Sequence, residues 1–263
     1  LPLGEIAMLL LEPESSDSLF RWGFFNEALS RIEYYEGYVL EPVAEARRDK
    51  VNLHPREGWV EQDGEEVLAA VVEVVAELLA DPPGEVVACG LDHQGESVLA
   101  WDVETGKPLS PIVVWQDKRS QEVLDRLGDL EDEVRDLSGL PFDPYFSAAK
   151  LAWLLEHNDA VQMARDAGTL RMGTVDSFLC DRLGAGFATD ASTASRTQLH
   201  TLGKPGFDPK LCEIFGVPPE VLPDVRDSAG ELAMLEHESW PAELPLCGQV
   251  VDQQAALAGA ACV

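Results

Sequence analysis

Basic residues are scarce in this sequence. Lys and Arg together number 19, whereas Asp and Glu number 48, which leaves a formal net charge of −29. Nucleic acids and anionic membranes bind proteins through clustered Lys and Arg side chains, so neither is an expected partner. The acidic excess, in which most of the few basic residues are Arg, fits a protein kept soluble in high salt. It equally fits an ordinary acidic protein of the cytoplasm, where we expect this chain to be located.

Long apolar runs and paired cysteines are also missing. The most apolar stretch, VLAAVVEVVAELLA, is interrupted by two glutamates at helical spacing, and the sequence does not open with a charged segment followed by an apolar run. Both features argue against export and membrane insertion. The five cysteines are widely spaced with no C-x-x-C pair, so we expect them to be reduced thiols in a core.

Histidine is rare as well, and no metal site is expected. His54 and Glu57 have the H-x-x-E spacing of zinc ligands. Pro55 lies inside this motif, however, and no second histidine stands at a usual partner spacing. The flanking residues are typical of a loop, and we therefore interpret the motif as a structural loop.

The 263 residues suffice for one large domain or two modest ones. Residues 1–50 hold seven of the nineteen aromatic side chains, with a strand expected at 6–11 and a helical stretch from about residue 19. This change in composition predicts a boundary near Lys50, between an aromatic-rich N-terminal segment (1–50) and the rest of the chain (51–263).

Beyond that boundary the pattern indicates an α/β protein. Asp63, with Glu66 three residues later, is typical of a helix N-terminus, and a strand is expected at 86–91. Two strand-like runs around Thr105-Gly106 predict a hairpin between residues 97 and 115. Further helices are expected at about 120–127, 131–137, 147–156, 160–167, 175–182 and 209–215, then a strand at 245–251 and a helix from Asp252.

Three strand ends carry polar residues, which is where open α/β sheets place their sites. In GLDHQGES an apolar strand opens into Asp92 and Glu96, although a plain polar turn would look the same. In IVVWQDKRS, Trp115 could wall a polyol or sugar ring or could be a core residue. In VVDQQAA, Asp252 could cap a helix or take a proton from a substrate hydroxyl, with the Gln253 amide holding another hydroxyl.

Six segments, in order, resemble the FGGY carbohydrate kinases, and in particular their glycerol kinase-like members. They are HPREGWVEQD, GLDHQGESVLAWDVETGKPLSPIVVWQDKRS, SGLPFDPYFSAAKLAWLL, GTVDSFLCDRL, TDASTASRTQLH and VVDQQAALAGAACV. The resemblance implies an actin-like, RNase-H-like two-domain fold in which ATP-Mg phosphorylates a polyol or sugar hydroxyl. The chain would supply the first, substrate-binding domain of such a kinase over residues 51–263.

The same resemblance implies roles for five residues. Asp252 corresponds to the catalytic base of the G-D-Q-Q segment, and Gln253 to the substrate-binding glutamine beside it. Glu96 matches the glutamate of N-Q-R-E-T, Trp115 the tryptophan of V-W-Q and Tyr145 the tyrosine of D-P-Y-F-S, which line the polyol pocket. Carboxylate, amide and phenol groups bind hydroxyls, and an aromatic wall covers a carbon chain.

The sequence departs from the family pattern in several places. Gly95 stands in place of an arginine, which favours a polyol or sugar larger than glycerol, and Val251 stands in place of a glycine. An N-terminal strand followed by the D-x-G-T turn that holds ATP phosphates does not occur, and the second domain would begin where the sequence stops. We therefore expect an incomplete ATP and Mg²⁺ site, no activity from this chain alone, and a second kinase domain or another copy of the chain as partner. The alternative is a non-catalytic polyol-binding or interaction module.

Residues 1–48 resemble a late segment of bacterial zinc metallocarboxypeptidase-like proteins. No zinc ligand or catalytic glutamate comes with this segment, so it implies no peptidase site. The resemblances predict a junction between the two kinds of sequence near residues 48–52.

Overall fold

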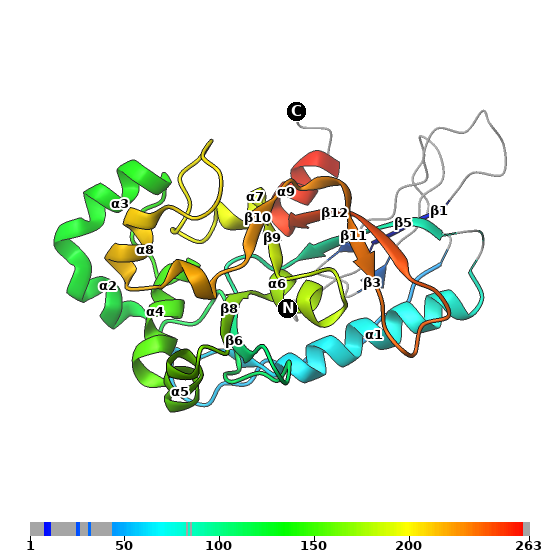
Figure 1. Cartoon of the computed structure of the whole chain (residues 1–263), viewed down its shortest axis with the longest axis horizontal. Coiled ribbons are helices and arrows are strands. Elements are labelled where there is room, and N and C mark those ends of the chain that lie inside the picture. Colours follow the sequence, from blue (N-terminus) through cyan, green and yellow to red (C-terminus); the bar gives the residue numbers. More distant parts are fainter. Residues whose placement is uncertain are drawn as a thin grey trace.

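In the computed structural model the described residues are 8–11, 25–26, 31–32, 44–82, 84 and 86–259. They form the mixed α/β fold that the sequence predicts (Figure 1). The helices are α1 (Gly64–Ala80), α2 (Gln121–Leu127), α3 (Glu131–Ser138), α4 (Ser147–His157), α5 (Asp159–Ala167), α6 (Val175–Arg182), α7 (Ala191–Ala194), α8 (Pro209–Phe215) and α9 (Asp252–Gly259). Two 3-10 turns lie at Gly128–Leu130 and Pro219–Val221.

The strands form two four-stranded sheets and two short pairs. The first sheet has the order β1 (Met8–Leu11), β5 (Val86–His93), β12 (Leu244–Val251) and β11 (Ala229–Leu235). The second has the order β4 (Glu61–Gln62), β7 (Ile112–Val113), β6 (Val98–Asp102) and β8 (Leu170–Thr174). The short pairs are β9 (Ala188–Asp190) with β10 (Asp224–Arg226), and β2 (Phe25–Asn26) with β3 (Arg31–Ile32).

The central pair of the first sheet positions the candidate site. Strands β5 and β12 are parallel, with His93 opposite Val251. Their carboxyl ends therefore lie side by side, so that the segment after His93 and the start of α9 meet at one edge. This is the edge at which open α/β sheets bind ligands.

Strand β6 separates two hydrophobic cores. Its alternate residues Leu99 and Trp101 belong to the core beneath α1 and α6, whereas Val98 and Ala100 belong to the core beneath α4 and α5. Successive side chains of a strand point to opposite faces, so one strand can serve both cores. In Figure 1 the long helix α1 accordingly runs along one side, while α2, α3, α4, α5 and α8 gather at the other end.

Most predicted elements beyond residue 50 are confirmed. The Asp63 side chain accepts hydrogen bonds from the backbone amides of Glu65 and Glu66, as an N-cap should. Strands β6 and β7 pair as the predicted hairpin, although the main partner of β6 is β8, which the sequence analysis did not predict. Helices α2 to α6 and α8 begin and end within one or two residues of the expected positions.

The N-terminal segment is described only in part. A strand is found at Met8–Leu11, within the expected range, and it pairs antiparallel with β5. The helix expected from about residue 19 falls mostly outside the described residues, but its two described pieces, β2 and β3, are paired strands, so the helical prediction is wrong there. The 1–50 boundary and the peptidase-like resemblance of 1–48 stay predictions. None of the described helices is long and apolar enough to cross a membrane.

Candidate functional site

The five predicted site residues come from four segments of the fold, which meet at the ends of β5 and β12. Glu96 follows β5, Asp252 and Gln253 begin α9 after β12, and Trp115 and Tyr145 lie in the loops before α2 and α4. Trp115 contacts Tyr145, and Tyr145 is hydrogen-bonded to Gln253, while Glu96 and Asp252 interact electrostatically. Their catalytic and binding roles stay predictions.

Glu96 is held rigidly. Its backbone has a φ of 60°, in the left-handed region that residues other than glycine rarely adopt. Its side chain is 1% exposed. Arg196 Nε donates to Glu96 Oε1 at 2.6 Å. Burial raises the pKa of this carboxyl, while the Arg196 charge works in the opposite direction. The surroundings thus over-determine one position for the carboxyl, as is common at functional sites.

An aromatic pair adjoins this carboxyl. The rings of Trp115 and Tyr145 meet edge to face with centroids 5.4 Å apart. Gln253 Nε2 donates to the Tyr145 hydroxyl at 2.9 Å, which joins the aromatic pair to the start of α9. The backbone amide of Trp115 donates to Ser97 Oγ at 3.1 Å and so ties the indole to the segment after β5.

Asp252 is the first residue of α9 and is partly exposed. Its Oδ1 accepts the backbone amide of Gln253 at 2.7 Å, so the carboxylate faces the helix N-terminus, where negative charge is favoured. Burial raises the pKa of both Glu96 and Asp92, and the charge of Asp252 adds to this rise, which places the three carboxyls in one electrostatic environment. The two interpretations of Asp252, helix cap and proton acceptor, are therefore compatible.

Two cations near the site were not singled out from the sequence. Lys150 is fully buried, and its Nζ donates to the backbone carbonyls of Tyr145 and Phe146. Burial lowers the pKa of Lys150 to about 7. Arg196 lies just after α7, 100 residues from the Glu96 it binds. The segment ASRTQ was visible in the sequence, but only the fold brings it to Glu96.

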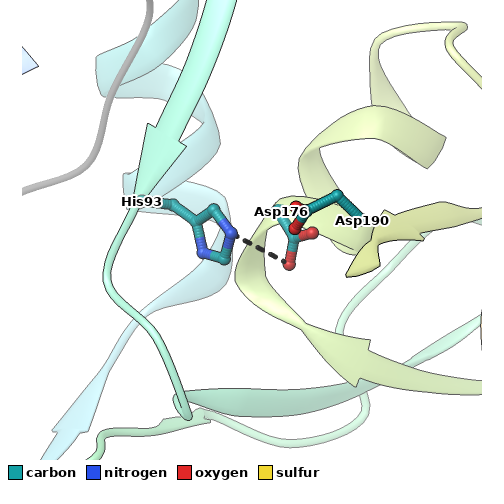
Figure 2. Close-up of side chains that lie close together, drawn as sticks. All are labelled: His93, Asp176 and Asp190. Atoms are coloured by element: carbon teal, nitrogen blue, oxygen red, sulfur yellow. Dashed lines mark ion pairs between the residues drawn. The ribbon is translucent and has the colours of Figure 1, made fainter. Parts of the chain in front are cut away.

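Behind the site lies a buried group of three side chains, His93, Asp176 and Asp190 (Figure 2). One ligand atom from each falls within 4.8 Å of the others, and His93 Nε2 lies 3.6 Å from Asp176 Oδ1. Burial works against a charged imidazole, but the nearby carboxylates outweigh it and raise the pKa of His93.

The hydrogen bonds of this group join several elements of the fold. Asp190 accepts the amides of Ser192 and Thr193 at the start of α7, and Asp176 accepts Thr189 Oγ1. His93 Nδ1 lies 3.0 Å from the Gln94 carbonyl, so this nitrogen carries the proton. Only Asp176 Oδ1 among these carboxylate oxygens has no hydrogen-bond partner among the described residues, and the imidazole faces it. The expectation of no metal site stays a prediction.

The geometry defines an α/β domain in which carboxylate, amide and aromatic side chains gather at one sheet edge, and comparison with known proteins assigns its family. Residues 41–259 match the FGGY family of carbohydrate kinases, N-terminal domain. The chain therefore belongs to this family.

Its relatives include glycerol kinases. The glycerol kinase of Ectopseudomonas mendocina is 40% identical over 228 residues, covering 84% of this chain and 46% of the relative. That of Alcanivorax borkumensis is 41% identical over 225 residues, covering 83% of this chain and 45% of the relative. The chain thus spans about half the length of these relatives.

Solved structures of carbohydrate kinases share the fold of this chain. The crystal structure of Plasmodium falciparum glycerol kinase with ADP superposes with a TM-score of 0.82 at 28% identity, over 88% of this chain and 48% of that one. The xylulose kinase of Lactobacillus acidophilus has a TM-score of 0.75 at 17% identity, which shows the shared fold alone. The predicted fold class, the first domain of an actin-like sugar kinase, is confirmed.

Proposed function

We propose that this chain is the acceptor-binding half of a kinase that phosphorylates a polyol hydroxyl. The observation that carries the proposal is the convergence of Glu96, Trp115, Tyr145, Asp252 and Gln253 at one sheet edge. Trp115 and Tyr145 offer an apolar wall for a carbon chain, while the carboxylates and the amide offer acceptors and donors to its hydroxyls. Asp252, partly exposed, is placed to accept a proton from the hydroxyl that is to be phosphorylated.

The phosphoryl donor implied by the family is ATP with Mg²⁺. Phosphoryl transfer depends on positive groups around the transferred phosphate. The two cations described near Asp252 do not fit this purpose, because Lys150 is buried against backbone carbonyls and Arg196 binds Glu96. We therefore assign the five predicted site residues to the polyol and neither of these two cations to the nucleotide.

The same observation supports a second candidate, a polyol-binding module without catalysis. Here the aromatic wall and the hydroxyl-binding groups would act as in the first proposal, and Asp252 would serve only as a hydrogen-bond acceptor. The two candidates differ in turnover and not in binding.

A coupled assay of ATP consumption over a panel of polyols and sugars distinguishes them. When the chain is combined with a nucleotide-binding kinase domain, the kinase proposal expects polyol-dependent turnover that Asp252→Asn lowers by at least about 100-fold, because the general base is lost while size and shape are kept. Calorimetric binding of the polyol should persist in Asp252→Asn. The exposed Asp166→Asn serves as the matched control and should leave both measurements unchanged.

Each outcome has a clear meaning. Binding without turnover, even when a nucleotide-binding kinase domain is supplied, would favour the module, and turnover unaffected by Asp252→Asn would contradict the assignment of the base. Absence of polyol binding in the unaltered chain would contradict both candidates.

A further inference from the structure

Arg196 occupies a central place among the groups that line the proposed polyol site. Its Nε donates to Glu96 Oε1 at 2.6 Å, and its guanidinium carbon lies 5.8 Å from the centre of the Tyr145 ring. The Arg196 side chain is 21% exposed, whereas that of Glu96 is 1% exposed. The guanidinium is therefore the part of this ion pair that a ligand can reach.

Gly95, the neighbour of Glu96 in the sequence, cannot easily be replaced by a positively charged residue. A Cβ atom added to Gly95, the residue before Glu96, would lie 2.6 Å from Val251 Cγ2. Real Cβ contacts are essentially never that short. Val251 cannot simply withdraw, because its side chain is fully buried and its backbone amide donates to Ser192 Oγ at 3.0 Å. Position 95 is thus closed to side chains as long as Val251 is present.

The chemistry of the Arg196–Glu96 pair selects for a hydroxyl. A guanidinium only donates hydrogen bonds, and an ionised carboxylate only accepts them. A ligand oxygen that meets both groups must accept one hydrogen bond and donate another, which a hydroxyl does and a carbonyl oxygen does not. The bond to Glu96 uses Nε, so the two terminal nitrogens of Arg196 are the donors suited to such an oxygen.

We propose that Arg196 is the substrate-binding cation of the acceptor site. It selects polyols by donating a hydrogen bond to one hydroxyl group, which in turn donates a hydrogen bond to Glu96. This inference rests on the proposed function and names a specificity-determining residue for it. The close packing of Gly95 on Val251 leaves this role to Arg196, which comes from a distant segment of the chain.

Calorimetry with glycerol, propane-1,2-diol and propane-1,3-diol tests the role of Arg196 in the full chain. Arg196→Gln is expected to weaken glycerol binding by about 10- to 100-fold, the usual effect of losing a hydrogen bond to a charged group. The unaltered chain should bind glycerol more tightly than the diol that lacks the recognised hydroxyl, and Arg196→Gln should abolish that preference. Arg171→Gln removes a comparable, partly buried ion pair with Asp181 away from the site and should change neither.

The outcomes separate a binding role from a structural one. Unchanged binding in Arg196→Gln, or equal weakening for all three ligands, would overturn the proposal. If Arg196→Gln does not fold, Arg196→Lys provides the measurement, because it keeps the charge and loses the fork of donors. Reduced discrimination is then expected, and full discrimination would overturn the proposal. If the unaltered chain binds none of the three ligands, the same comparison is made with the polyol or sugar of the panel that binds most tightly, and if none of the panel binds, the proposed function fails first, independently of Arg196.

Thermal unfolding tests the close packing of Gly95 against Val251. Gly95→Ala is expected to lower the melting temperature of the otherwise unaltered chain. In a Val251→Ala background, where the obstructing methyl group is removed, Gly95→Ala should lower the melting temperature much less. An equal decrease in melting temperature in both backgrounds would show that Val251 does not prevent a side chain at position 95. That part of the proposal would then be wrong.

Discussion

At the residue scale, Asp92 is a carboxyl that the fold holds in its neutral form. Its side chain is 7% exposed, and its Oδ1 has no hydrogen-bond partner among the described residues. Burial, together with the charge of Asp252, raises the pKa of Asp92 to about 8. A neutral Asp92 can lie near Asp252 without electrostatic repulsion between the two carboxyls.

This raised pKa makes a prediction for stability. In the unfolded chain Asp92 titrates near pH 4, and in the folded chain near pH 8, so the folded state holds an extra proton between these values. The contribution of Asp92 to stability is therefore complete below about pH 4 and falls by about 1.4 kcal/mol per pH unit as the pH rises to 8.

Asp92→Asn mimics the neutral carboxyl and should remove this loss. The stability of Asp92→Asn relative to the unaltered chain is expected to increase from pH 5 to pH 8 in denaturant unfolding, and to level off above that. The exposed Asp136→Asn is the control and should show no such trend. A constant difference between Asp92→Asn and the unaltered chain would show that Asp92 is ionised throughout.

At the element scale, strand β6 joins the two cores because its side chains alternate between them. Leu99, fully buried, packs in the core beneath α1, where its Cδ1 also limits the space at Gly64. Loss of either core would expose one face of the same strand. The two cores are therefore expected to unfold together.

Leu99→Ala tests this coupling. We expect a loss of about 2–5 kcal/mol in the free energy of unfolding, from the lost apolar burial and the cavity left behind. Tryptophan fluorescence and circular dichroism should still report one coincident transition. The matched control is Leu202→Ala, at a side chain that is 66% exposed, which should change stability by less than about 0.5 kcal/mol. Two separated transitions in Leu99→Ala would contradict the coupling.

The elements that the sequence predicted are those with strong local signals. Asp63 before α1, the Thr105-Gly106 turn and the helical spacing of α2 to α6 each specify structure within a few residues. Strands β8 and β11 were not predicted, because LRMGT and AGELAML contain glycine and polar residues and become strands only through their partners β6 and β12.

The same limit applies to the site. Glu96, Trp115, Tyr145, Asp252 and Gln253 were named from motifs, and the structure brings them together. Arg196 and Lys150 could not be assigned, since their importance depends on contacts with Glu96 and with two backbone carbonyls that only the folded chain creates.

At the scale of the whole molecule, the net charge of −29 sets the response to salt. Exposed ion pairs such as Arg48–Glu73 contribute little each and weaken as salt rises. Repulsion among the excess carboxylates is screened by the same salt, and the Debye length falls from about 30 Å at 0.01 M to about 3 Å at 1 M. With 29 more acidic than basic groups, we expect the screening of repulsion to be the larger effect.

The melting temperature should therefore rise by several degrees between 0.01 M and 1 M NaCl, at about 2–4 °C for each kcal/mol of repulsion removed. Sucrose of equal osmolality separates screening from excluded-solute effects and should produce a smaller rise. A melting temperature that falls with salt would mean that the ion pairs outweigh the repulsion.

The packing of Gly95 against Val251 has a consequence for how sequences of this family can diverge. A larger residue at position 95 would collide with Val251, and a smaller residue at position 251 would leave a cavity at the end of β12. Either single substitution gives a less stable protein, so the two positions should change together over evolutionary time. Among family members, a large residue at the first position should accompany glycine at the second, and glycine at the first should accompany a branched side chain at the second.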